Sequence, residues 1–348
     1  NMCLVLGIES SCDETAAAVV KDGTEVLSNI VASQDALHQE YGGVVPEIAS
    51  RAHLERILPV VEQAIHKANI SINDIDCISV GNRPGLIGSL LVGVAAAKSL
   101  AWTLEKPLVA VDHVLSHLWA PLLSGEAPQY PALGIVVSGG HTSTLRLDNP
   151  SSAICIGKTI DDAAGEAFDK AASILELGWP GGRLIDAAAQ HGTSVTRLPR
   201  PKLKDRRNDF SFSGLKTALL YGVRGNPFRE NGKTHFPKTA ASLSVEEKNN
   251  WATSFQEAVV DTIISGLREV IAHTDCKSLI AGGGVLANSR LRKHLHTFSE
   301  EHQIKLHIPE LKYCVDNAAM VAGLGWYQFS NNQLADLELT ARPRGIAS

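Results

Sequence analysis

The chain has 348 residues, of which 44% are hydrophobic and 20% charged, and its formal net charge is −5. This composition excludes a disordered chain, and the length exceeds that of one compact core, so two lobes are expected. The negative net charge restricts any nucleic-acid contact to a local basic patch.

The six cysteines are scattered without a Cys-x-x-Cys pair, which is typical of reduced thiols in the cytoplasm. The N-terminal run CLVLGI is too short for a secretion signal. The longest apolar stretch, LLVGVAAAKSLAW, is interrupted by Lys98 and predicts a buried helix, so no membrane span is expected.

The first third of the chain predicts alternating strands and helices. Residues 3–9 and the run AAAVV, on either side of SSCDET, predict a β-hairpin. Residues 44–68 carry apolar side chains at spacings of three and four, which predicts a helix. DCISV predicts a strand, the turn GNRPGLIG leads into a buried helix ending near Leu104, and KPLVAV predicts another strand.

The same pattern then restarts. ALGIVVSGGHTSTLRL predicts a second hairpin, whose Leu133-Gly134-Ile135 repeats Leu6-Gly7-Ile8. Later, DCKSLIAGGGVLANSRLR repeats the strand, glycine turn and helix of DCISVGNRPGLIGSL. Two such repeats in corresponding places predict two related α/β lobes. Strand–Gly–helix units are common in unrelated α/β proteins, so the repeats indicate architecture and not function.

The expected boundaries are an N-terminal lobe over residues 1–112, onto which a closing helix over 317–348 packs, and a C-terminal lobe over 113–316. Residues 196–250 are rich in Pro, Asn, Lys and Arg, and predict an irregular insertion on the second lobe. This insertion is either a solvated loop or a contact for an RNA backbone. Its first part concentrates positive charge at Arg197, Arg200, Lys202, Lys204, Arg206 and Arg207.

Two glycine turns are candidates for nucleotide binding. Gly139-Gly140 can adopt the positive φ of a tight turn, which exposes consecutive N–H groups as an anion site, although an ordinary hairpin turn is the commoner reason for such a pair. IAGGGVLANSRL predicts a helix N-terminus near Asn288, beside which a nucleotide can approach the backbone. Corresponding turns in the two halves indicate a nucleotide held between the lobes.

Several acidic residues lie near these turns. Asp13 and Glu14 occupy the first hairpin turn and could position a metal-bound water, although Asp also forms turns without any such role. Asp169 is predicted on a helix, where it could accept a hydrogen bond from a ribose or simply face solvent beside a lysine. Gly181-Gly182 is another place where a ligand could approach the backbone closely, and Asp186 follows one turn later.

His113 and His117 stand four residues apart in VDHVLSHLWA, so one helix face presents both imidazoles. They are either two metal ligands or two ordinary polar residues. Asp316 is the best candidate for a third ligand, although an Asp before an apolar helix is also a favoured N-cap. A zinc peptidase of the His-Glu-x-x-His type needs a Glu between its ligands, and residues 114–116 supply none.

Eight stretches, in order and approximate spacing over roughly residues 3–330, resemble one family. They are GIESSCDETAAAVV, GGVVPEIASRAHLE, DHVLSH, VVSGGHT, GEAFDKAA, FSFSGLKTA, GGGVLANSRLR and DNAAMVAGLG. The family is the bacterial tRNA adenosine threonylcarbamoyltransferase catalytic subunit, formerly described as an O-sialoglycoprotein endopeptidase. The resemblance implies an α/β fold of the actin/Hsp70/sugar-kinase type, with a nucleotide cleft between duplicated RNase H-like lobes.

The resemblance also implies the reaction. The family transfers threonylcarbamoyl from threonylcarbamoyl-AMP to N6 of adenosine 37 in tRNAs that read ANN codons, and releases AMP. It works with a homologous, non-catalytic partner subunit and a small P-loop ATPase. The alternatives are a metalloendopeptidase acting on glycoproteins, disfavoured by the missing Glu, and an ATP-driven binding protein of the Hsp70 type, disfavoured because no separate peptide-binding domain follows the lobes.

The resemblance carries over to individual residues. His113, His117 and Asp316 would hold one divalent ion, Fe²⁺ or Zn²⁺, and Asp13 and Glu14 match acidic residues near the reacting end. The residues expected to cradle the adenylate are Val136, Val137, Ser138, Gly139, Gly140, Asp169, Gly182, Asp186 and Asn288.

Three departures from the family pattern are visible. Ser116 stands where Gly or Ala is usual, and Arg83-Pro84-Gly85 replaces a Gly-Pro-Gly turn, which adds a positive charge. The stretch around 222–245 is longer than usual. None of these departures removes an expected ligand.

Overall fold

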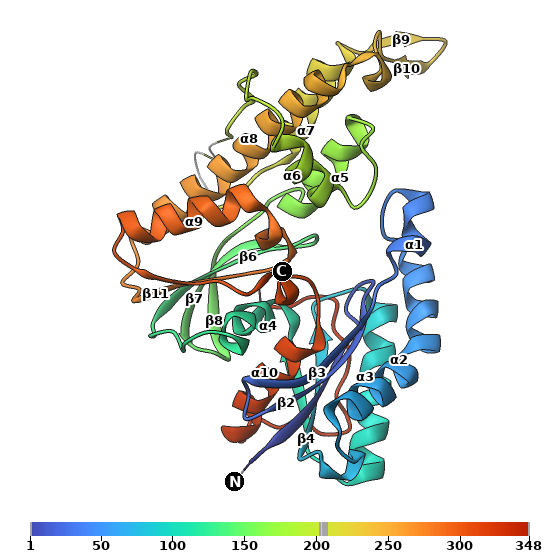
Figure 1. The fold of residues 1–348 in the computed structure, drawn as a ribbon, viewed down its shortest axis with the longest axis vertical. Coiled ribbons are helices and arrows are strands. Elements are labelled where there is room, and N and C mark those ends of the chain that lie inside the picture. The colour runs from blue at the N-terminus through green and yellow to red at the C-terminus, as the bar shows by residue number, and fades with distance from the viewer. Residues whose placement is uncertain (1, 202, 204–207, 347–348) are drawn as a thin grey trace.

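The structure is a computed structural model that describes residues 2–201, 203 and 208–346. Two five-stranded sheets form its framework, and the helices α4 (His113–Trp119) and α10 (Ala318–Ser330) lie between them (Figure 1). The predicted basic residues Lys202, Lys204, Arg206 and Arg207 lie outside the described residues.

The N-terminal sheet has the strand order β3-β2-β1-β4-β5. The first three strands pair antiparallel, and β1, β4 and β5 pair parallel. Its central strand, LVLGIE, is buried at every position because protein layers cover both faces of the sheet. The bounds are β1 (Leu4–Glu9), β2 (Thr15–Lys21), β3 (Glu25–Ala32), β4 (Cys77–Arg83) and β5 (Leu108–Asp112).

The C-terminal sheet repeats this topology. Its order is β12-β11-β6-β7-β8, with an antiparallel meander β6–β7–β8 and parallel pairs β6–β11 and β11–β12. The predicted duplication is therefore confirmed, with β6 corresponding to β1 and β11 to β4. The bounds are β6 (Ala132–Val137), β7 (Thr142–Asn149), β8 (Ser152–Lys158), β11 (Ser278–Gly282) and β12 (Lys305–His307).

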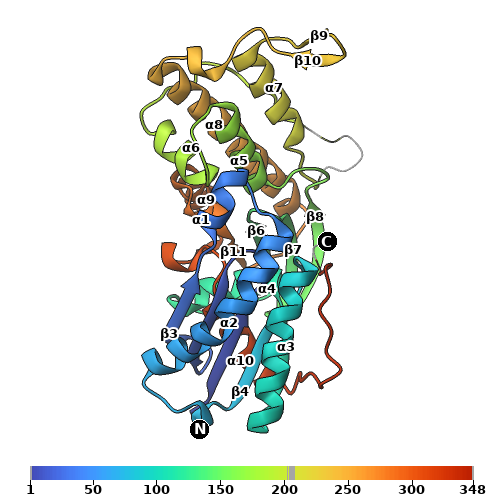
Figure 2. The same ribbon diagram turned by 90° about the vertical axis from the view of Figure 1, so that its right-hand side faces the viewer.

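Helices cover the outer face of each sheet. On the N-terminal sheet, the two predicted helices α2 (Pro46–Ala68) and α3 (Ile87–Leu104) lie side by side (Figure 2). Their apolar faces bury the side chains of β1, β2 and β4 in one core. The C-terminal sheet packs against a larger core formed by α5 (Ala164–Ile174), α6 (Gly181–Ala189), α7 (Ser213–Arg224), α8 (Val245–Ile271) and α9 (Ser289–Glu301).

Short elements complete the chain. The helix α1 (Asp35–His38) precedes α2, and a small ribbon joins β9 (Phe228–Glu230) to β10 (Lys233–His235). The 3₁₀ turns are η1 (Gln39–Tyr41), η2 (Ile72–Asp74), η3 (Ala120–Leu123), η4 (Ala240–Ser242), η5 (Gly284–Ala287) and η6 (Leu311–Tyr313).

Each of the two central helices follows a strand of one sheet and packs on the other sheet. Helix α4 follows β5 of the N-terminal sheet but packs on β6 and β11, whereas α10 comes after β12 and packs on β1 and β4. Glycines at corresponding strand positions permit this approach. A Cβ at Gly7 would overlap Ala318 and Ala322 of α10, and one at Gly134 would overlap Leu118 of α4. The two helices and both sheets share a third core.

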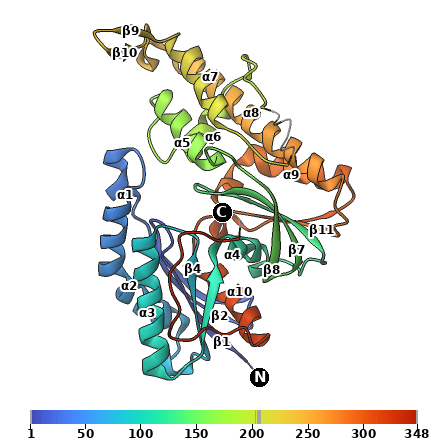
Figure 3. The same ribbon diagram turned by 180° about the vertical axis from the view of Figure 1, so that it is seen from behind.

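Two predicted segments differ from the structure. Residues 196–250 are not wholly irregular, because they contain α7, whose leucines enter the C-terminal core, and the β9–β10 ribbon. The closing helix ends at Ser330 and not at 348. The residues after it run back along the N-terminal sheet, where the Ala335 amide donates to Leu108 and the Ile346 amide to the Asp112 side chain (Figure 3).

Helix α3 has the length and composition of a membrane-spanning helix, with a mean hydropathy of 1.5 over 18 residues. In the structure it packs against α2 and β4. Gly93 also lets the helix approach the end of β1, because a Cβ there would overlap Ser10. Only 33% of this window is buried, so the expectation of a buried helix is confirmed for the face on the sheet and is wrong for the outer face.

We expect Gly7→Ala to destabilise the protein by roughly 2–3 kcal/mol, because the added methyl group meets the backbone of α10 and cannot be relieved by a rotamer change. Urea unfolding followed by circular dichroism measures the difference. Gly43→Ala is the matched control, since no atom lies within 4 Å of a Cβ there. Equal unfolding midpoints for the two variants would show that α10 does not depend on this close approach.

Candidate functional site

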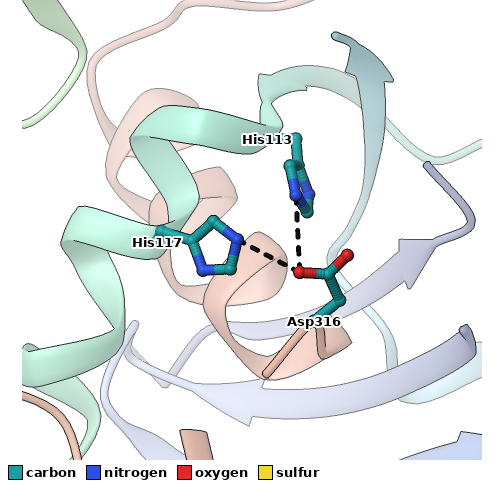
Figure 4. A group of neighbouring side chains, drawn as sticks. All are labelled: His113, His117 and Asp316. Atoms are coloured by element: carbon teal, nitrogen blue, oxygen red, sulfur yellow. Dashed lines mark ion pairs between the residues drawn. The ribbon is translucent and has the colours of Figure 1, made fainter. Parts of the chain in front are cut away.

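The two histidines lie at the start of α4, where the helix leaves β5. The Asp112 side chain caps this helix by accepting from the amides of Val114 and Leu115 at 3.0 and 3.2 Å. His113 and His117 are both buried, with 4.7 Å between their ring centroids. Their Nε2 atoms lie 3.5 and 3.1 Å from one carboxylate oxygen, Oδ1 of Asp316 (Figure 4). The structure thus brings together the three residues predicted to hold a metal.

Asp316 does not serve as a helix cap, which was the alternative role considered for it. Asn317 is the N-cap of α10, and its side chain accepts a hydrogen bond from the Met320 amide at 3.1 Å. The carboxylate of Asp316 is therefore free to face the histidines. Because α4 and α10 start at corresponding ends of the two sheets, their N-termini converge on this carboxylate (Figure 4).

A second carboxylate orients the first histidine. Glu9, the last residue of β1, is fully buried, and its Oε2 lies 3.1 Å from Nδ1 of His113. Its other oxygen accepts from the Ser11 amide at 2.6 Å. The sequence analysis did not select Glu9, although an acid at the end of the otherwise apolar strand LVLGIE was a signal, since a buried carboxylate needs a partner.

The electrostatics of the cluster favour cations. Burial by itself lowers the pKa of His113, but the Asp316 and Glu9 carboxylates outweigh burial and raise this pKa to about 10. Burial opposes ionisation of Asp316, yet His113 and His117 hold the pKa of Asp316 well below its usual range. Nearby, burial and the same histidines lower the pKa of His141 to about 4. His141, which the sequence analysis also passed over, is thereby kept neutral.

The cluster fits a metal ion. One ligand atom from each of His113, His117 and Asp316 falls within 4.8 Å of the others. Neither ring nitrogen of buried His117 has a hydrogen bond of good geometry to any described residue, although a metal would satisfy one of them. The His113–Glu9 pair supplies the carboxylate that commonly orients a metal-bound imidazole. Two imidazoles and a carboxylate suit Zn²⁺ or Fe²⁺ and leave further coordination positions open.

Asp13 and Glu14 lie in the turn between β1 and β2, on the same side as the cluster. Burial, followed by repulsion from Asp316 and Asp13, holds the pKa of Glu14 well above its usual range. A buried histidine fixes this turn: Nε2 of His53 lies 2.9 Å from the Cys12 carbonyl, and its Nδ1 lies 2.7 Å from Oγ1 of Thr15. The carbonyl can only accept, so Nε2 carries the proton and Thr15 donates to Nδ1.

The first glycine turn is open, but its backbone differs from the prediction. Neither Gly139 nor Gly140 has φ in the left-handed region, so the positive φ expected for this turn is wrong. The turn is held instead by Ser138, whose amide donates to the His141 carbonyl at 2.7 Å. Both glycines are exposed, and no atom lies within 4 Å of a Cβ built on either. Val136 and Val137 are fully buried, so they support the turn from within the sheet.

Hydrogen bonds and close contacts join the remaining predicted residues to this turn. Gly165 at the start of α5 packs against Gly139, and from the same helix Asp169 accepts from the Gly181 amide at 2.7 Å. Asp186 of α6 accepts from the Ser289 hydroxyl at 2.8 Å. The preceding Asn288 is the N-cap of α9, as predicted.

Asn288 uses its amide internally: the oxygen accepts from Leu291 at 2.9 Å, and the nitrogen donates to Gln256 at 2.8 Å. Gly182 at the start of α6 has open space on its Cβ side, with no atom within 4 Å of a Cβ built there. The helix N-termini of α5, α6 and α9 and the glycine turn therefore form one connected surface.

The departures Arg83 and Ser116 have local partners. Nε of Arg83 lies 3.2 Å from the Asp112 carboxylate that caps α4, so its charge is partly neutralised beside the cluster. The Ser116 hydroxyl donates to the His113 carbonyl at 2.7 Å within the helix. Neither side chain replaces a proposed ligand.

Comparison with known proteins identifies the family. A family model described as tRNA N6-adenosine threonylcarbamoyltransferase matches residues 25–323. The chain belongs to this family. A relative of that name from Syntrophomonas wolfei is 46% identical over 341 residues, covering 98% of this chain and 96% of its own length. Another, from Treponema denticola, is 46% identical over 348 residues, covering 99% and 98%.

More distant solved structures share the fold. A full-length HypF structure in a phosphate- and nucleotide-bound form is 12% identical, with a TM-score of 0.58 over 94% of this chain and 46% of its own. A 2-hydroxyisocaproyl-CoA dehydratase activator from Clostridium difficile is 11% identical, with a TM-score of 0.51 over 95% and 97%. The two-lobed actin-like α/β architecture predicted for the chain is thus confirmed.

We expect Glu9→Gln to weaken metal binding about 10- to 100-fold, because the neutral amide no longer fixes the tautomer and orientation of His113. Competition with a chromophoric chelator measures the affinity for Zn²⁺. Glu126→Gln, which alters an exposed acid paired with Lys305, is the control and retains wild-type affinity. A folded Glu9→Gln protein that binds Zn²⁺ like the control would exclude this role for Glu9.

Proposed function

We propose that the protein transfers the threonylcarbamoyl group from threonylcarbamoyl-AMP to N6 of adenosine 37 in tRNAs that read ANN codons, releasing AMP. The observation that carries this proposal is the His113–His117–Asp316 cluster. Gly282 and Gly283 connect it to the glycine turn, because a Cβ on one would overlap His117 and a Cβ on the other Val137. We also propose two lobes, one of residues 1–112 with 317–348 and the other of residues 113–316.

In this proposal the open glycine turn and the helix N-termini cradle the adenylate. Backbone amides at the glycine turn would bind phosphate oxygens, since exposed N–H groups favour anions, whereas the Gly181 amide at the start of α6 already donates to Asp169. The residues assigned to this cradle are Val136, Val137, Ser138, Gly139, Gly140, Asp169, Gly182, Asp186 and Asn288. The side chains of Asp186 and Asn288 already hydrogen-bond to other residues of the protein. We therefore propose that they shape the cradle more than they contact the adenylate directly.

The reaction joins the adenine N6 to the carbamoyl carbon and breaks the bond from that carbon to a phosphate oxygen of AMP. N6 loses one proton, and AMP leaves with the electron pair of the broken bond. A divalent ion, Fe²⁺ or Zn²⁺, held by His113, His117 and Asp316 would supply Lewis-acid polarisation of the carbonyl or hold the phosphate. Asp13 and Glu14 would lie at the reacting end.

The peptidase alternative receives no support from the site. Residues 114–116 between the two histidines are Val, Leu and Ser, and their side chains are buried. None of them can act as the general base that a peptidase of the His-Glu-x-x-His type places there.

We expect His117→Ala to lower formation of threonylcarbamoyladenosine by at least about 100-fold, because it removes a metal ligand from the reacting centre. The assay contains the protein, its partner subunits, the adenylate synthase, ATP, threonine, bicarbonate and unmodified tRNA, and the nucleosides are separated by mass spectrometry. His273→Ala, at an exposed position, is the control. Wild-type yield from His117→Ala, or metal-dependent cleavage of a glycoprotein by the wild type, would refute the proposal.

We further propose that this cytoplasmic enzyme assembles with a homologous, non-catalytic subunit and a small P-loop ATPase. An exposed apolar surface on α2 and α3 supports a subunit contact. Leu54 and Leu58 are 67% and 61% exposed, and Leu91 and Trp102 are 54% and 71% exposed. Apolar side chains gathered on one face commonly mark a protein–protein interface.

Substituting Leu54→Glu and Leu58→Glu together is expected to abolish the complex with the homologous subunit, because burying two carboxylates in an apolar interface is unfavourable. Size-exclusion chromatography with light scattering measures the complex. Leu311→Glu, at an equally exposed leucine of the C-terminal half, is the control. A complex of unchanged mass and affinity from the double variant would place the interface elsewhere.

A further inference from the structure

The β9–β10 ribbon stands apart from both cores. It extends from the far end of α7 and α8, on the opposite side of the C-terminal helices from the N-terminal sheet (Figures 1 and 3). All six of its strand residues are exposed, on both faces of the ribbon. An isolated two-stranded ribbon is at best marginally stable in water, so an element that buries nothing gains order from a partner.

The segment that contains the ribbon is basic in an acidic protein. Residues 222–245 hold four Lys or Arg and a single acid, Glu230, whereas the whole chain has a net charge of −5. Arg229 and Lys233 are exposed, and neither forms an ion pair with any described carboxylate. Some other exposed cations differ: Arg51, Arg268 and Lys305 are each paired with a glutamate. Glu230 stands opposite Lys233 in the ribbon, so the two cations and one acid leave the strands with a net positive charge.

The ribbon also presents an aromatic platform. Phe228 and His235 face each other across the two strands, with ring centroids 5.8 Å apart and planes at 28°. Phe228 is 48% exposed. Exposed rings beside Arg and Lys are the combination on which unpaired nucleobases stack while the cations contact the phosphates.

Helix α7 connects this platform to the proposed site. Its first residue, Ser213, is held by the carboxylate of Asp161, which precedes Gly165 by four residues. Gly165 packs against Gly139 of the glycine turn. The 12 residues of α7 then span about 18 Å before the chain enters the ribbon. A polyanion that extends from the glycine turn along α7 and is longer than this helix would therefore reach the ribbon.

We propose that the β9–β10 ribbon is a second contact surface for the tRNA, in which Arg229 and Lys233 bind backbone phosphates and the Phe228–His235 pair stacks on an unpaired base. The proposal rests on the proposed function, because it takes the substrate to be tRNA. Charge favours a nucleic acid over a protein partner, since the ribbon offers cations and one exposed phenylalanine but no broad apolar surface.

The test is the equilibrium binding of an in vitro transcribed tRNA with an ANN-reading anticodon, measured at several salt concentrations. Arg229→Gln with Lys233→Gln is expected to weaken binding about tenfold near 0.1 M salt and to reduce the slope of log K against log salt by about 2. Phe228→Ala is expected to weaken binding about fivefold or more without changing that slope. Lys67→Gln with Lys106→Gln, in the last turn of α2 and two residues after α3, removes the same charge as a control.

Steady-state kinetics with tRNA distinguish the ribbon proposal from the proposed function. In the complete reaction the ribbon variants are expected to raise the KM for tRNA and to keep the wild-type kcat, because the ribbon lies outside the reacting centre. Ribbon variants with the binding, salt slope and KM of the control would overturn the ribbon proposal, even if the wild type modifies tRNA. A wild type that binds tRNA through the ribbon but forms no modified nucleoside would overturn the proposed function alone.

Discussion

The exchange of two helices between the sheets is the constraint on which the rest of the structure depends. Helix α4 leaves the N-terminal sheet to pack on the C-terminal one, and α10 does the reverse. Both can approach only because Gly7 and Gly134 have no side chain. The exchange makes the N-termini of the two helices converge, so that His113, His117 and Asp316 meet although some 200 residues separate them in the sequence. The candidate metal site is thus a product of the duplication.

Charge balance explains the composition of the site. Glu9, Asp316, Asp13 and Glu14 bring four acids close to two facing imidazoles, which favours a bound cation. Burial, followed by repulsion from Asp316 and Asp13, raises the pKa of Glu14. The contacts of His53 fix the turn that carries Asp13 and Glu14, and so keep both carboxylates on the side of the histidine cluster.

The sequence predicts well whatever depends on local pattern. Apolar periodicity locates α2 and α3, and the repeated glycine turns reveal the duplicated topology. Local sequence pattern does not predict the features that contacts between distant segments determine. Asp316 and Asn317 are equally good caps by residue type, and the structure assigns the cap to Asn317. Gly139 and Gly140 read as a turn with positive φ, yet the backbone of Ser138 and His141 holds it without one.

The partners of Glu9 could not be predicted, because its contact with His113 joins positions 104 residues apart. The end of the closing helix at Ser330 was missed for a similar reason. The residues beyond it gain hydrogen bonds to β5 and its flanking side chains as an extended strand-like segment, and periodicity alone does not register such contacts.

The most direct test of the account is a single-turnover reaction with isolated threonylcarbamoyl-AMP and unmodified tRNA, using metal-stripped protein before and after one equivalent of Fe²⁺ or Zn²⁺ is restored. AMP and threonylcarbamoyladenosine are measured in the same samples. The account predicts equal amounts of the two products from the reconstituted protein and neither above background from the stripped protein. Equal transfer by both preparations, or AMP release without nucleoside modification, would contradict it.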